Sequence, residues 1–65
     1  MNWDQIKSRW IQLRGKAKEK WGKLTDEDLD LIDGKRDRLV EKLQEKYRRS
    51  RYVTEREIDK WIDGL

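Results

Sequence analysis

The sequence predicts an all-α fold, a compact bundle of four helices in the order long, short, long, short. Three observations support this prediction. The 65 residues include no proline and only four glycines, the apolar residues recur at spacings of three and four, and two stretches place an acidic residue three positions after a Thr. The spacing is that of one face of an amphipathic helix, and the Thr pattern is typical of helix starts. A single domain covering 1–65 is expected at this length.

The first apolar set predicts one long helix over the first 24 residues. Asn2 is a suitable N-cap, and Gln5 stands three residues later, as in a capping box. Gly15 is expected to weaken or bend this helix, and Gly22 is expected to end it. The inward face should carry Trp3, Ile6, Trp10, Leu13, Ala17, Trp21 and Leu24.

The acidic stretch that follows is predicted to begin a short second helix, from about Asp26 to Ile32. Thr25 can cap it with its hydroxyl, and Asp28 at the third position can bond back to the Thr25 amide. Leu24 and Leu29 have the spacing of a hydrophobic staple around that cap. The inward face of this helix should carry Leu29 and Ile32. Acidic residues in a first turn also complement the helix dipole, so the stretch is best interpreted as a helix start.

A second copy of this pattern predicts the last helix, from about Glu55 to Asp63. Here Thr54 is the expected cap, Glu57 closes the box, and Val53 and Ile58 form the staple. The apolar side of this helix should carry Ile58, Trp61, Ile62 and Leu65.

A third helix is predicted between them, from about Lys35 to Arg49. Its apolar side should carry Leu39, Val40, Leu43 and Tyr47. The letters "EKW" and "EKY" each precede a capped short helix that ends in "IDG", which indicates an approximate internal duplication of one helical hairpin. Two such hairpins packed face to face would bury all four apolar sides.

Charge alternates along the chain in blocks. Residues 1–24 hold seven bases and two acids, residues 25–34 hold five acids and no base, and residues 35–52 hold eight bases and three acids. Basic last turns followed by acidic first turns are the arrangement that helix dipoles favour. The blocks therefore have a structural explanation, and the net charge is only +3.

Catalytic and metal chemistry find little support. The chain has no His and no Cys, the commonest general base and the softest metal ligand. Asp26, Asp28 and Asp30 are spaced two apart as in a calcium loop, but Leu31 and Asp37 occupy the positions that need Gly and Glu. We therefore expect no enzyme, no metal site and no cofactor.

Nucleic-acid binding is the main alternative. A third-helix stripe of bases recurs at helical spacing and could contact phosphates; it consists of Lys35, Arg38, Lys42, Lys46 and Arg49. A first-helix stripe consists of Arg9, Lys16, Lys20 and Lys23. Interleaved acids at Asp37, Glu41 and Glu45 dilute the positive field, so a solvated surface is favoured.

A membrane surface is a further option, because Trp and basic residues alternate on the first helix. The same Trp residues are needed for the core of so small a domain, although Trp3 could be a partly exposed lid. No apolar run approaches the roughly 20 residues of a membrane span. A monomer in the cytoplasm is the resulting expectation.

Two segments resemble the CsbD-like family of small bacterial stress-response proteins. The pattern GK-x-KE-x-x-GKLT occupies Gly15–Thr25, and GKRD-x-LV-x-K-x-QE-x-Y occupies Gly34–Tyr47. The resemblance implies a bundle of four helices similar to sterile-alpha-motif-like folds, and expression under general, osmotic or envelope stress. It supplies no catalytic residues. A soluble protective or adaptor role is the function it favours, with an unidentified protein partner.

Overall fold

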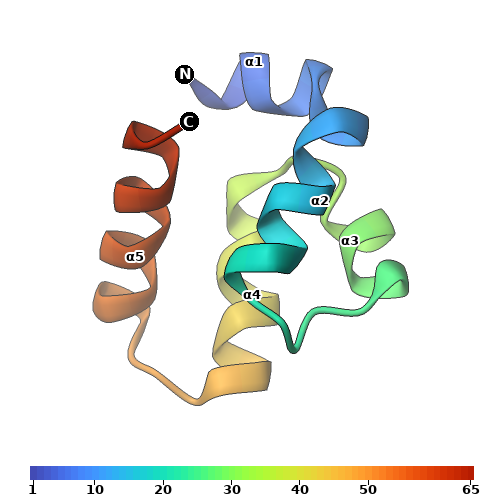
Figure 1. The fold of residues 1–65 in the computed structure, drawn as a ribbon. Coiled ribbons are helices and arrows are strands. Elements are labelled where there is room, and N and C mark those ends of the chain that lie inside the picture. Colours follow the sequence, from blue (N-terminus) through green and yellow to red (C-terminus); the bar gives the residue numbers. More distant parts are fainter.

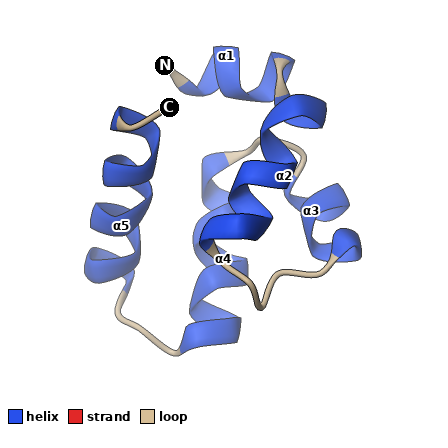
Figure 2. Cartoon of the chain, in the orientation of Figure 1, coloured by secondary structure: helices blue, strands red, loops and turns tan.

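The protein contains helices and no strands, and the computed structural model describes all residues 1–65 (Figures 1 and 2). This confirms the predicted all-α class. The helices in chain order are α1 (Trp3–Ser8), α2 (Trp10–Lys20), α3 (Asp26–Ile32), α4 (Arg36–Tyr47) and α5 (Arg51–Asp63).

The predicted long first helix is divided at Arg9, so the prediction of four helices is wrong by one. The Asn2 cap is confirmed: its side chain accepts from the Gln5 amide at 2.9 Å, and the Gln5 side chain accepts from the Asn2 amide at 3.0 Å. A continuous helix from Trp3 to Lys20 would be about 27 Å long at 1.5 Å per residue and would span nearly the whole molecule. The longest dimension of the molecule is 28 Å. The division lets α1 lie across the end of the bundle (Figure 1).

The short second helix has the predicted bounds. Thr25 caps α3, and the chain leaves it through two left-handed residues, Asp33 (φ 48°) and Gly34 (φ 71°). A Cβ on Gly34 would lie 2.6 Å from Lys7 Cα, which means that the backbone of α1 rests directly on this turn. Gly22 lies in the turn after α2, whose last helical residue is Lys20.

The predicted cap at Thr54 is wrong, because α5 begins four residues earlier than expected. Ser50 is the cap, and its hydroxyl accepts from the Val53 amide at 3.1 Å. Thr54 is buried in the first turns, and its hydroxyl donates to the Ser50 carbonyl at 2.9 Å. The earlier start places Thr54, Ile58 and Ile62 four residues apart on one buried face.

This start also changes the helix lengths. The last helix has 13 residues, against 7 in α3, so the long-short alternation is wrong and the duplicated-hairpin prediction fails for α5. The expected staple partner Val53 is 47% exposed. The third helix is shorter than predicted, since Arg48 (φ 51°) already ends it in the left-handed conformation.

The core is confirmed in full. Its 13 buried apolar residues all belong to the predicted inward faces, and the four remaining members of those faces are partly buried against it: Trp3, Tyr47, Trp61 and Leu65. Helix α4 packs against both α3 and α5. The Trp10 indole N–H donates to the Leu29 carbonyl at 2.8 Å, which joins α2 to α3.

Candidate binding surfaces

The acidic stretch of α3 is structural. The Asp28 amide donates to Thr25 Oγ1 at 3.1 Å, and the Thr25 amide donates back to Asp28 Oδ2 at 3.0 Å, which is the predicted capping box. Lys46 Nζ lies 3.2 Å and Lys42 Nζ 3.9 Å from the buried carboxylate. The hydrogen bond from the Thr25 backbone, assisted by Lys46, holds the pKa of Asp28 below its ordinary value despite the opposing effect of burial.

The neighbouring acids attach α3 to α2. Lys18 Nζ lies 2.8 Å from Asp26, Arg14 pairs with Asp30, and Arg14 also donates to the Asp26 carbonyl at 3.1 Å. The hydrogen bond from Lys18 lowers the pKa of Asp26. No group of three or more acidic side chains is placed to hold a metal ion.

The third-helix stripe is largely occupied by contacts within the chain. Lys42 and Lys46 pair with Asp28, and Lys42 also lies 3.4 Å from Glu45. Arg49 pairs with Glu57 on α5. The two remaining members differ: Arg38 donates to the Leu31 carbonyl at 2.9 Å, while Lys35 is exposed and forms no ion pair.

The bases of the first-helix stripe, in contrast, are not paired with acids of the chain. All four of its members, Arg9, Lys16, Lys20 and Lys23, are exposed and form no ion pair with an acidic side chain. Lys23 Nζ lies over the Tyr47 ring, 5.0 Å from its centroid. The sequence-based prediction named both stripes as possible phosphate contacts; the structure pairs most bases of the third-helix stripe within the chain and leaves those of the first-helix stripe unpaired.

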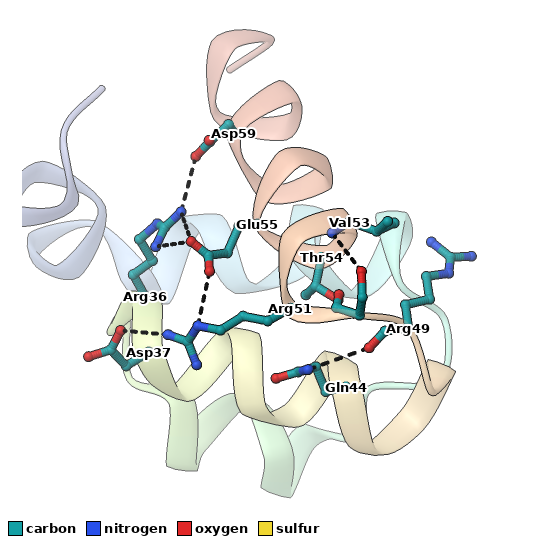
Figure 3. A network of polar contacts seen from close by, with 10 residues as sticks. Arg36, Asp37, Gln44, Arg49, Arg51, Val53, Thr54, Glu55 and Asp59 are labelled. Atoms are coloured by element: carbon teal, nitrogen blue, oxygen red, sulfur yellow. Dashed lines mark hydrogen bonds and ion pairs between the residues drawn. The ribbon is translucent and has the colours of Figure 1, made fainter.

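One face of α5 is bound to α4 by a polar network (Figure 3). Arg36 lies 3.3 Å from Glu55 and 3.5 Å from Asp59, while Arg51 lies 2.9 Å from Glu55 and 3.6 Å from Asp37. Glu55 therefore receives two guanidinium groups, one from each helix. The network holds the first turns of α5 against the start of α4.

A second contact fixes α5 to the end of α2. The Trp21 and Trp61 rings meet edge to face with centroids 5.2 Å apart. The Trp21 indole N–H donates to Glu57 at 3.0 Å, and the other oxygen of Glu57 accepts from Arg49. Both carboxylate oxygens of Glu57 are thus engaged within the protein.

Beside this contact lies an open groove of about 510 Å³, called here the α2–α5 groove. It is lined by Lys20, Tyr52, Val53, Arg56, Glu57 and Lys60. Tyr52 is 69% exposed, and the Arg56 guanidinium lies over its ring at 5.9 Å. None of its three bases forms an ion pair. Sequence reasoning missed Tyr52, Arg56 and Lys60 as a group. The predicted helix start after Thr54 left Tyr52 in a loop, whereas in α5 the three residues follow one another at intervals of four.

Comparison with known proteins settles the family. The CsbD-like family model matches residues 4–51, nearly three quarters of the chain. The chain belongs to the CsbD-like family. This confirms the resemblance found in the sequence and places the protein in a general stress-response family. The match ends at the first residue of α5, so most of the α2–α5 groove lies beyond it.

Relatives match over more of the chain. A UPF0337 protein of Pectobacterium atrosepticum is 52% identical over 63 residues, which cover 97% of this chain and 91% of the relative. The UPF0337 protein YjbJ of Escherichia coli K12 is 49% identical over 61 residues, 94% and 88% of the two chains. A UPF0337 protein of Rhodopseudomonas palustris is 46% identical over 65 residues, 100% and 98%. No solved structure matches the chain. None of its helices is both long and apolar enough to cross a membrane.

Proposed function

We propose that this CsbD-like protein is a non-enzymatic adaptor of the bacterial stress response that acts in the cytoplasm by binding other proteins. General, osmotic or envelope stress is the proposed setting. Residues 1–65 are proposed to act as one domain, in which helices α2, α3, α4 and α5 form a sterile-alpha-motif-like arrangement. Family membership supports the stress role, and the groove supports the binding role.

The observation that carries the binding role is the contrast between the groove and the surfaces on which bases are paired within the chain. Seven of the 17 bases form ion pairs within the chain, and they connect α2 with α3 and α4 with its neighbours. The groove instead combines three unpaired bases with the exposed apolar surface of Tyr52 and Val53. Exposed apolar surface with a polar rim is typical of protein interaction sites.

The carboxylates support a binding role over acid–base catalysis. General acids need a pKa raised toward neutrality, usually by burial. The most buried carboxylate, Asp28, has its pKa lowered by its hydrogen bond from Thr25 and by Lys46. Its oxygens are already used in the capping box and the lysine pair.

The experiment that tests the proposal is affinity capture from stressed cells, performed with and without nuclease. We expect specific proteins to remain bound after nuclease treatment. Loss of all captured material on nuclease treatment would contradict the adaptor role and favour the second candidate.

That second candidate is weak, sequence-nonspecific binding of nucleic acid, and the free first-helix stripe favours it. About four phosphate contacts would give a log–log salt slope near −3.6 on duplex DNA. The informative variant is Arg9→Gln with Lys16→Gln, which should remove about two of those contacts and leaves the α2–α5 groove unchanged. Lys42→Gln with Lys46→Gln is a poor test, because both lysines pair with Asp28 and the change would disturb folding.

A further inference from the structure

We infer that the α2–α5 groove binds an acidic protein segment that presents one apolar side chain between carboxylates. The inference rests on the proposed adaptor function and specifies the chemistry of the partner. A short amphipathic helix or an extended acidic segment with a Leu or Phe anchor would meet this description.

Charge is the first reason. Lys20 approaches the groove from the end of α2, and Arg56 and Lys60 approach from successive turns of α5. The single acid in the lining, Glu57, has both oxygens engaged by Trp21 and Arg49. The groove therefore offers uncompensated positive charge, and carboxylates are the complementary groups on a protein partner.

Shape and exposed apolar surface are the second reason. A volume of about 510 Å³ falls within the roughly 300–1,000 Å³ typical of ligand sites. Tyr52 and Val53 are adjacent in sequence and are exposed to 69% and 47%, respectively. Both line the groove, so an apolar side chain lying in it would bury area on both, and interface hot spots are enriched in Tyr and Arg.

The groove is also held in place before any partner arrives. The Trp21–Trp61 contact and the Trp21–Glu57 hydrogen bond fix the end of α2 against α5. On another face of α5, Glu55 joins the network with Arg36 and Arg51 (Figure 3). A rigid site loses less conformational freedom on binding, so weak individual contacts contribute more to affinity.

The same features favour a protein segment over single-stranded nucleic acid. Proteins that bind single strands stack successive bases on several aromatic side chains along a basic groove. Tyr52 is the one exposed aromatic residue here, and the Arg56 guanidinium already lies over its ring. Val53 beside it offers an aliphatic surface, which suits an apolar side chain.

The direct test is fluorescence anisotropy with three labelled probes: a short helical peptide of glutamate with one leucine face, a polyglutamate peptide, and a single-stranded DNA oligonucleotide. We expect the amphipathic peptide to bind most tightly. Lys60→Glu should weaken its binding about three- to tenfold, and Tyr52→Ala about tenfold. The matched control is Lys35→Glu, which reverses another exposed, unpaired lysine immediately before α4 and should have little effect. Circular dichroism establishes that each variant is folded, and Lys60→Gln provides a milder substitution at the same position.

Two results would overturn the inference. Equal loss of peptide binding in Lys60→Glu and Lys35→Glu would show attraction to overall charge only. Tighter binding of the oligonucleotide, weakened by Tyr52→Ala, would assign the groove to nucleic acid. The adaptor proposal is tested separately by repeating the cell capture with Lys60→Glu. Protein partners retained equally by parent and variant would leave the adaptor role intact and refute the groove, whereas absence of partners from the parent refutes the adaptor role itself.

Discussion

Replacing Gly34 with Ala should destabilise the protein severely, although the change adds one methyl group. The backbone at Gly34 has φ 71°, and a Cβ there would lie 2.6 Å from Lys7 Cα and 3.2 Å from Lys7 N. The left-handed conformation costs a non-glycine residue about 1–2 kcal/mol. Displacing the packed α1 backbone adds about 1–3 kcal/mol, the usual cost of overpacking. We expect a total loss of about 2–5 kcal/mol in the free energy of unfolding.

This loss is comparable with the whole stability expected of so small a core, about 3–5 kcal/mol. Gly34→Ala should therefore be partly unfolded without denaturant. Urea unfolding followed by tryptophan fluorescence measures the effect. Gly15→Ala is the matched control, because Gly15 lies inside α2 with nothing within 4 Å of an added Cβ. The control should gain about 0.5–1 kcal/mol. A Gly34→Ala protein as stable as the parent would show that α1 does not rest on this turn.

Three further predictions concern helix ends. In urea unfolding, Thr25→Ala and Ser50→Ala should each lower the free energy of unfolding by about 0.5–2 kcal/mol. Thr54→Val, which keeps the buried shape, should lower it much less. A large loss at Thr54 alone would show that Thr54 is the cap after all. The folded state lowers the pKa of Asp28, so its stabilising contribution is complete above the ordinary value of about 3.9 and disappears as the pH falls through the folded pKa. Asp28→Asn should therefore be less stable at neutral pH and show a flatter acid unfolding profile, and an unchanged profile would contradict this. Arg48→Gly should raise the melting temperature, because Arg48 has φ 51° and glycine relieves a cost of about 1 kcal/mol; a lower melting temperature would show that the Arg48 side chain contributes more than its strain.

The core and α3 were predictable because their signals are local. Helical spacing alone identified every buried apolar residue. The Thr25–Asp28 box has both of its bonds within four consecutive residues, so nothing distant is needed to form it. At α3 the cap, the staple and the apolar face agree with the tertiary structure, whereas the same combination at Thr54 did not set the start of α5.

The division at Arg9 was not predictable from spacing, because the apolar face continues through it without a break. The bend was expected at Gly15, the weaker helix former, yet Gly15 stays inside α2. A straight helix from Trp3 to Lys20 would be about 27 Å long and would run nearly the full 28 Å length of the molecule, leaving α1 unable to cross the end of the bundle. The divided chain buries Ile6 and packs the Lys7 backbone against the Gly34 turn.

The start of α5 depended on a choice between two good caps, Ser50 and Thr54. Local chemistry favoured Thr54, which is followed by Glu57 as in a capping box. The tertiary structure favours Ser50, because Thr54 then buries its methyl group beside Ile58 while its hydroxyl still bonds the Ser50 carbonyl. Glu57 is then free to accept from Trp21.

The basic stripes show most clearly what a single sequence leaves open. On a helical wheel, Lys46 and Lys20 are equivalent: each belongs to a regular row of bases. Their difference lies in other helices, since α3 brings Asp28 to Lys46, whereas α5 brings Arg56 and Lys60 to the groove that Lys20 lines. The first arrangement neutralises charge within the fold, and the second accumulates it beside exposed Tyr52. A row of bases becomes a binding surface only where the fold supplies no acid for it, and this condition moves the candidate site from α4 to the α2–α5 groove.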